Sequence, residues 1–241
     1  MGKYLIYGGS GVIGCAIARR LVHAGHRVHL AGRSAQTLKA LSVEFGCGYS
    51  VGDVLAPGVI EQTTSDAGDT LDGLVFAVGS INLKPLARLS DEDFLNDFKL
   101  NALSAAKSIQ AALPALKASH GTASVLLFSS IAVGQGFASH ASVSMAKGAI
   151  EGLTRALSAE LAPKIRVNAI APSLTDTGIA KAITGNEALT KAVVGLHALP
   201  RIGIGDDMAG IAEVLLTDAG SWITGQVMAI DGGRSRARTK G

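Results

Sequence analysis

The sequence has too few cysteines for a disulfide-stabilised fold and too little net charge for a nucleic-acid surface. Its 241 residues include two cysteines, Cys15 and Cys47, and carry a net charge of +3. Two cysteines cannot build a disulfide framework, and we expect both to be reduced in a cytoplasmic protein. A surplus of three positive charges indicates no nucleic-acid partner. The basic residues within 234–241, Lys240 among them, are expected to form a flexible, solvated tail.

Long uninterrupted apolar runs and a secretion signal are also absent. Residues 118–146 contain no Asp, Glu, Lys or Arg, but Ser, Gly, Gln and His interrupt them, so we expect no membrane span. The strand-like KYLIYGG begins at residue 3, and we expect no signal peptide. Hydrophobic residues make up 48% and charged residues 17% of the chain, which argues against a disordered protein. No linker, repeat or metal site is expected.

What the sequence does contain is an alternation of short β-rich runs with longer amphipathic ones. The candidate strands are residues 3–8, 27–32, 48–52, 71–78, 123–130, 165–172 and 225–232. They are rich in Val, Ile and Leu without strict alternation, which is typical of strands buried on both faces of a parallel sheet. Amphipathic segments such as 13–25 and 207–220 lie between them. The pattern predicts a single α/β domain over residues 1–241, with a Rossmann-type, doubly wound parallel sheet of about seven strands.

A glycine-rich turn follows the first candidate strand directly. Gly9, Gly11 and Gly14 fit the G-x-G-x-x-G pattern between a strand and a helix. Glycines at these places allow the backbone to approach a pyrophosphate, which the helix N-terminus then faces. We therefore predict a dinucleotide site whose first loop comprises Gly8, Gly9, Ser10, Gly11, Val12, Ile13 and Gly14.

Acidic residues are missing where an NAD-binding protein needs one. A carboxylate about 20 residues beyond the glycines would bind the ribose 2′-hydroxyl, but no Asp or Glu occurs between Gly14 and Glu44. The second candidate strand is followed instead by Arg33 and Ser34, with no acidic competitor in that stretch. Because a guanidinium binds phosphate with two hydrogen bonds, the sequence favours NADP(H) over NAD(H).

These motifs, taken together, resemble the short-chain dehydrogenase/reductase family over nearly the whole chain. The resemblance also rests on GDV, FAVGS, LLFSSIA, MAKGAIEGLTRALSAELAPKIRVNAIAPSLTDT and SWITGQVMAIDGG. It implies a small-molecule substrate and a homotetramer, with a dimer as the alternative. The family's middle loop glycine is replaced by Val12, and the spacing of Gly8, Gly11 and Gly14 is closer to the family's extended branch.

The resemblance also implies further cofactor contacts. Asp53, with Val54 beside it, would lie at the adenine, and Gly79 matches the glycine after the fourth strand. The segment PSLTDT, with Pro172, Leu174 and Thr177, would hold the nicotinamide carboxamide.

One member of the catalytic set that the resemblance implies is missing. Family enzymes reduce a carbonyl with a tyrosine, a lysine, a serine and an asparagine. Lys147, Ser130 and Asn101 stand at the matching places, but the tyrosine is replaced by Val143, which cannot transfer a proton.

Several groups could supply the missing proton. His140 and Ser144 are the nearest candidates, and Ser142 is a third, although we expect it to cap the helix. A water held by Lys147 is another source, and an imine protonated in solution needs no strong acid from the protein.

Three functions remain open on the sequence alone. They are an NADPH-dependent reductase of a carbonyl or imine in a small, largely apolar substrate, a non-catalytic NADP(H)-binding protein, and a structural oligomer. Retention of Ser130, Lys147 and Asn101 together favours the reductase. Residues 177–200 are expected to form a substrate lid that orders on binding, and His197 within it is expected to be a surface or lid residue.

Overall fold

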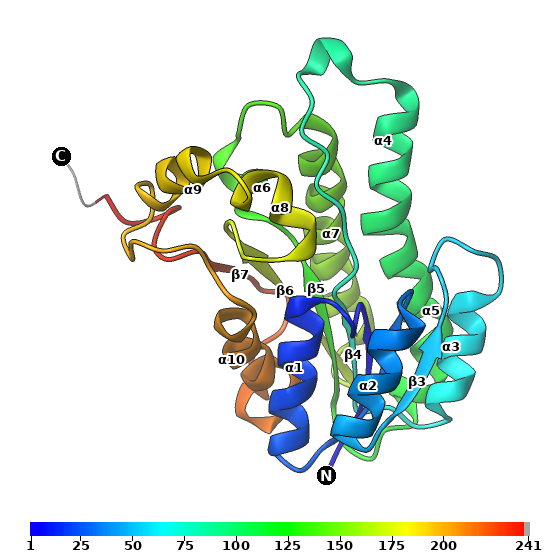
Figure 1. Cartoon of the computed structure of the whole chain (residues 1–241). Coiled ribbons are helices and arrows are strands. Elements are labelled where there is room, and N and C mark those ends of the chain that lie inside the picture. Colours follow the sequence, from blue (N-terminus) through cyan, green and yellow to red (C-terminus); the bar gives the residue numbers. More distant parts are fainter. Residues whose placement is uncertain (239–241) are drawn as a thin grey trace.

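The computed structural model describes residues 1–238. The fold is built on one parallel sheet (Figure 1). The seven strands lie in the order β3-β2-β1-β4-β5-β6-β7. They are β1 (Lys3–Tyr7), β2 (Arg27–Gly32), β3 (Gly48–Val51), β4 (Gly73–Phe76), β5 (Ala123–Phe128), β6 (Ile165–Pro172) and β7 (Val227–Ile230). The predicted doubly wound sheet is confirmed. The order reverses between β1 and β4, which opens a crevice at their carboxyl ends.

Helices follow most strands. They are α1 (Val12–His23), α2 (Ala35–Phe45), α3 (Val59–Ala67), α4 (Asp91–Phe98), α5 (Ser104–Lys117), α6 (Ile131–Gln135), α7 (Ala141–Leu161), α8 (Lys181–Thr184), α9 (Glu187–Val194) and α10 (Gly205–Leu216). Short 3₁₀ turns are η1 (Leu86–Arg88), η3 (Gly178–Ala180) and η4 (Asp218–Gly220), and the π-helical turn η2 (Lys99–Leu103) joins α4 to α5. Within residues 1–238, none of the helices combines the length and apolar character that a membrane crossing requires.

Two hydrophobic cores form, one on each face of the sheet. Helices α1, α2 and α10 cover one face, where Leu21 and Met208 pack with Leu30 and Leu126 of the strands. Helices α3, α5 and α7 cover the other face, where the core includes Ala67, Ile109 and Ile150. Burial on both faces explains why the central strands are continuous apolar runs.

Close packing at the first glycines brings α1 against the end of β1. A Cβ on Gly14 would lie 2.3 Å from the carbonyl oxygen of Gly8, so only glycine fits there. Gly8 itself has φ of +78°, in the left-handed region that glycine adopts readily. This contact sets the N-terminus of α1 beside the carboxyl ends of the strands.

Several strands end earlier than the sequence predicts. Strand β4 covers 73–76 instead of 71–78, and β5 ends at Phe128 instead of residue 130. The pairing between β4 and β5 ends at Phe76 and Leu127. The residues that follow the shortened strands, including Gly79 and Ser130, lie in loops at the carboxyl ends of the sheet.

The segment 177–200 carries its own helical turns above the carboxyl ends of the strands. It contains η3, α8 and α9, which lie near α6 in Figure 1. Its two ends are held together, because Thr175 pairs with Gly203 and the amide of Asp176 donates to the carbonyl of Gly203 at 2.9 Å. Its role as a lid stays a prediction.

Candidate active site

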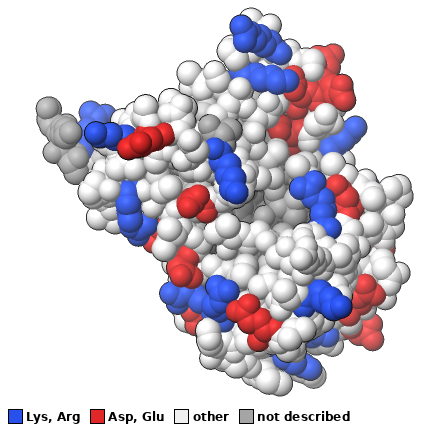
Figure 2. Space-filling model, viewed as in Figure 1, with Lys and Arg blue, Asp and Glu red and all other residues white. Residues whose placement is uncertain are grey.

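A cavity of about 450 Å³ lies at the carboxyl ends of β4, β5 and β6. Its walls come from the loops after these strands, from the start of α1 and α7, and from the segment 177–200. Eight predicted site residues line it: Ile13, Gly79, Ser130, His140, Lys147, Pro172, Leu174 and Thr177. On the face shown in Figure 2, which is hollowed near the middle of the view, acidic and basic side chains are interspersed.

The glycine loop presents free amides beside this cavity. Gly11 is the N-cap residue of α1 and offers no side chain to cap the helix. Among residues 1–238, we find no hydrogen-bond partner for the backbone N–H groups of Ser10, Val12 and Ile13. Gly9 lies against Leu30, because a Cβ there would be 3.0 Å from that side chain. Unpaired amides at a helix N-terminus are the arrangement that binds phosphate, so the loop fits a dinucleotide pyrophosphate.

Arg33 is exposed at the end of β2, with 82% of its side chain accessible. Its Nη1 lies 3.9 Å from Oδ2 of Asp53, which follows β3. The sequence indicated no acidic competitor near Arg33, and the structure corrects this, because neighbouring parallel strands bring their carboxyl ends to one edge. Ser34 caps α2 by accepting the amide of Thr37 at 3.3 Å. Val54, next to Asp53, packs against the hydrophobic core.

Lys147 lies on α7 with 8% of its surface exposed. Its Nζ donates to the carbonyl of Phe128 at 2.9 Å. Burial lowers the pKa of Lys147 to about 8, and the negative charge of Asp97 partly opposes this effect. The ammonium is thus placed in the cavity wall and gives up its proton more readily than an exposed lysine.

Asn101 lies in the π-helical turn η2 and is 1% exposed. Its Nδ2 donates to the Ser80 hydroxyl at 3.0 Å and to the Asp97 carbonyl at 2.9 Å. A Cβ on Gly79 would lie 2.9 Å from Asn101 Oδ1 and 3.2 Å from Lys147 Nζ. The absence of a side chain at Gly79 therefore lets the asparagine and the lysine approach each other.

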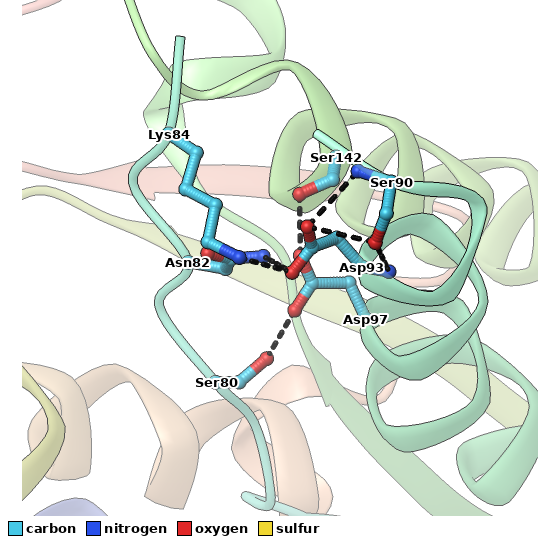
Figure 3. A network of polar contacts seen from close by, with 7 residues as sticks. All are labelled: Ser80, Asn82, Lys84, Ser90, Asp93, Asp97 and Ser142. Atoms are coloured by element: carbon cyan, nitrogen blue, oxygen red, sulfur yellow. Dashed lines mark hydrogen bonds and ion pairs between the residues drawn. The ribbon is translucent and has the colours of Figure 1, made fainter. Parts of the chain in front are cut away.

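Two carboxylates of α4 tie the loop after β4 to this cluster (Figure 3). Asp97, which is 4% exposed, accepts the hydroxyl of Ser80 at 2.8 Å and that of Ser142 at 2.5 Å. One turn earlier, Asp93 accepts Nζ of Lys84 at 2.6 Å. The hydrogen bond from Lys84 holds the pKa of Asp93 well below its usual range. The loop and the start of α7 are thereby held by the same helix.

Ser130 and Val143 lie in the wall of the same cavity as Lys147. Ser130 is the N-cap residue of α6, and its Oγ accepts the amide of Ala132 at 3.2 Å. Since that oxygen is an acceptor for the amide, its own hydroxyl hydrogen remains available to a ligand. Val143 is 6% exposed and brings only methyl groups to the wall.

The three proton-donor candidates at the start of α7 differ in position. His140 lines the cavity, and its Nδ1 hydrogen-bonds the carbonyl of Ala138 at 2.8 Å. Ser142 does not cap the helix as expected, because His140 is the N-cap residue and Ser142 donates to Asp97. Ser144 is not among the residues that line the cavity, and its buried Oγ has no partner within residues 1–238.

Sequence comparison assigns the chain to a family. The family model described as Enoyl-(Acyl carrier protein) reductase matches residues 9–235. The human protein named dehydrogenase/reductase SDR family member 2, mitochondrial, is 34% identical over 242 residues, covering 96% of this chain and 86% of that protein. A tropinone reductase homolog of Arabidopsis thaliana is 35% identical, covering 95% of this chain and 89% of the other. This chain belongs to the short-chain dehydrogenase/reductase family.

Solved structures agree with this assignment. A short-chain type dehydrogenase/reductase from Mycobacterium ulcerans has a TM-score of 0.91 at 28% identity, covering 98% of this chain and 90% of the other. A variant of the actinorhodin polyketide ketoreductase with NADPH has the same TM-score at 24% identity, covering 98% of both chains, and shows likeness in fold. The protein is therefore an oxidoreductase of this family.

The sequence analysis did not identify two residues of this short-chain dehydrogenase/reductase site, Asp97 and Arg234. Asp97 accepts the buried hydroxyl of Ser142. The spacing of Asp93, Asp97 and Asn101, four residues apart, was a signal that they share one helix face. Arg234 lines the cavity, so the predicted solvated tail does not begin there. Lys240, also predicted in the tail, lies outside the described residues.

His197 is another departure from expectation. It is 6% exposed, and its Nε2 lies 2.8 Å from the hydroxyl of Ser173. Burial lowers its pKa, which favours the neutral imidazole. The histidine is thus an internal contact between the segment 177–200 and the end of β6. The surface position is wrong, and a place in a lid stays a prediction.

Proposed function

We propose that the protein is an NADPH-dependent reductase that delivers hydride to the carbonyl or imine carbon of a small, largely apolar substrate. The observation that carries this proposal is that Ser130, Lys147 and Ile13 line one cavity of about 450 Å³. That volume suits a small ligand. When bound, NADPH supplies the hydride, and the remaining steps fall to residues of this chain.

The cofactor contacts in this proposal follow the strand ends. The free amides of Ser10, Val12 and Ile13 hold the pyrophosphate, and Lys147 holds the nicotinamide ribose. Pro172, Leu174 and Thr177 contact the carboxamide, since all three line the cavity.

At the other end of the cofactor, Arg33 and Ser34 bind the 2′-phosphate, while Asp53 and Val54 lie at the adenine. The contact of Arg33 with Asp53, at 3.9 Å and exposed, is weak enough to leave the guanidinium available. A bidentate phosphate contact then favours NADPH over NADH.

Ser130 stabilises the charge that develops on the substrate oxygen. The Ser130 oxygen accepts a hydrogen bond from the Ala132 amide, so the hydroxyl hydrogen can be donated to a ligand. A hydrogen bond aimed at a developing oxyanion in a dry site lowers the barrier by roughly 2–4 kcal/mol. Asn101, held by Asp97 and Ser80, lies against Gly79, as does Lys147, and helps to position the lysine.

The proton, in this proposal, comes from His140 or from Lys147 through a water. Ser142 is committed to Asp97, and Ser144 is not in the cavity wall. Because a carbonyl oxygen only accepts, Nδ1 of His140 carries a hydrogen, and only the imidazolium form also donates through Nε2. The pKa of Lys147, lowered to about 8 by burial, suits proton transfer near neutral pH. A protonated imine substrate would need neither group.

A second candidate function is a non-catalytic NADP(H)-binding protein. The buried valine at position 143 favours it, because the cavity wall there has no ionisable group. A structural oligomer is less well supported, since it gives the free Ser130 hydroxyl no role.

Two measurements separate these functions. Titration of nicotinamide fluorescence should show NADPH binding roughly ten- to a hundredfold more tightly than NADH. A panel of ketones, aldehydes and cyclic imines should then include at least one compound that oxidises NADPH. Tight NADPH binding with no oxidation across the panel would assign the non-catalytic function instead.

A matched pair of variants tests the proton path. Val143→Tyr restores the hydroxyl that the family resemblance implies, and Val143→Phe adds the same ring without it. We expect the tyrosine variant to reduce the best carbonyl substrate faster than the phenylalanine variant, with a changed pH profile. Equal rates and profiles for the two variants would argue that Val143 does not occupy the proton-donor position.

A further inference from the structure

Arg234 places a guanidinium in a cavity wall that is otherwise mainly apolar. Ile81, Phe137, Ile179 and Ile183 line the cavity together with it. The Arg234 Cζ lies 4.4 Å from the centre of the Phe137 ring, in cation–π geometry. Its Nη1 donates to the Ser173 hydroxyl at 3.3 Å. An arginine so placed contacts whatever occupies the apolar part of the cavity.

The backbone around Arg234 is held in place before any ligand arrives. Gly232 and Gly233 have φ of +62° and +83°, which turns the chain back after β7. The Asp231 carboxylate accepts the amides of Gly233 at 2.9 Å and Ser235 at 2.8 Å. Gln135, at the end of α6, donates to the carbonyl of Ser235 at 3.1 Å. The arginine is therefore fixed from both its backbone and its side chain.

Among residues 1–238, Arg234 forms no ion pair, although the charge of Asp231 attracts it. Within residues 1–238, no acidic oxygen lies within 4.0 Å of its guanidinium. Asp231, the nearby acid, already accepts two backbone amides. Burial lowers the pKa of Arg234 from its usual value, but an arginine remains protonated at physiological pH. Four of its five N–H donors have no partner among the described residues.

We propose that Arg234 binds a carboxylate on the substrate, so that the preferred substrate is an apolar carbonyl or imine compound that carries one carboxylate. A guanidinium forms two parallel hydrogen bonds with a carboxylate, and the apolar wall strengthens them by excluding water. The inference rests on the proposed function, because it names the class of substrate for the same cavity.

Binding of carboxylates that cannot be reduced tests this without any turnover. Benzoate, cyclohexanecarboxylate and 4-phenylbutanoate are each titrated into the NADPH-loaded protein by calorimetry, beside the three matching amides. We expect at least one carboxylate to bind roughly ten- to a hundredfold more tightly than its amide. The preference should vanish in Arg234→Gln and persist, reduced, in Arg234→Lys.

The matched control is Arg236→Gln, which removes the same charge from an exposed arginine two residues away. This variant should keep the preference for carboxylates. No preference in the wild-type protein, or an equal loss in Arg236→Gln, would overturn the proposal. Unchanged thermal unfolding of Arg234→Gln would show that its loss of binding is not a loss of folding.

Turnover separates this inference from the proposed function. An aromatic keto acid should have a kcat/KM roughly ten- to a hundredfold above that of its methyl ester, and Arg234→Gln should remove the difference. Carboxylate binding through Arg234 without any NADPH oxidation would keep the inference and refute the reductase. If the kcat/KM for NADPH oxidation depends neither on the substrate carboxylate nor on Arg234→Gln, the reductase function stands and the inference is refuted.

Discussion

Replacing Lys147 with methionine should change how the stability of the protein depends on pH. The Lys147 ammonium is 8% exposed and donates to the Phe128 carbonyl. Burial lowers its pKa from the ordinary 10.5 to about 8, although Asp97 attracts the positive charge. Methionine has a similar length and no charge, so Lys147→Met removes the titration while it keeps most of the packing.

The size and sign of the effect follow from linkage. Below pH 8 the folded and unfolded states both hold the proton, and the folded state bears a cost of about 3 kcal/mol, from the fall in pKa from 10.5 to about 8. Between about pH 8 and 10.5 the unfolded state holds the proton and the folded state releases it. The free energy of unfolding of the wild-type protein therefore rises with pH in this window, relative to the variant.

Urea unfolding without cofactor, at several values between about pH 7 and pH 10, measures this difference. Other titrating groups occur in both proteins and cancel, including Tyr4, whose pKa burial raises to about 12. Lys107→Met, on the exposed side of α5, is the control and should give a difference that does not change with pH. If the difference between wild type and Lys147→Met stays constant to within about 0.5 kcal/mol from pH 7 to pH 10, the burial argument fails.

Three further outcomes follow. Arg33→Ala should weaken NADPH binding roughly ten- to a hundredfold and leave NADH binding unchanged, measured by fluorescence titration; equal losses for both cofactors would contradict the 2′-phosphate contact. Asp97→Asn removes the negative charge that raises the pKa of Lys147, so any limb of the pH–rate profile that reports Lys147 should move to lower pH, and an unmoved limb would exclude that coupling. Light scattering at micromolar concentration should give a homotetramer, with a dimer as the alternative, and a monomer of 24.5 kDa would exclude both.

The fold was predictable because independent local signals agree. Apolar runs without alternation indicated buried parallel strands, and the glycine pattern located the first strand–helix turn. The limits of the strands were less predictable. Phe76 is the last residue of β4 because its pairing with Tyr7 and Leu127 ends there, and this depends on strands remote in sequence.

The candidate site was predictable where a motif carries the residue, as for Ser130 and Lys147. It was not predictable where residues distant in sequence meet. Asp53 approaches Arg33 because β3 lies beside β2. The sequence around Arg33 contains no acidic residue and does not show which strand is its neighbour. The basic residues around Arg234 predicted a solvated tail. Their charge does not reveal the turn that brings Arg234 against Phe137.

Deuterium transfer from NADPH labelled at C4 of the nicotinamide tests most directly whether this site catalyses hydride transfer with Val143 in its wall. NADPH is labelled with deuterium on one C4 face in one preparation and on the other face in a second, and each is used with the best substrate from the panel. We expect one of the two preparations to transfer one deuterium to the product. Ser130→Ala should lower kcat/KM for that reaction by roughly 2–4 kcal/mol with little change in NADPH affinity. If neither labelled NADPH transfers deuterium to the product while NADPH still binds tightly, the proposed reductase function is contradicted.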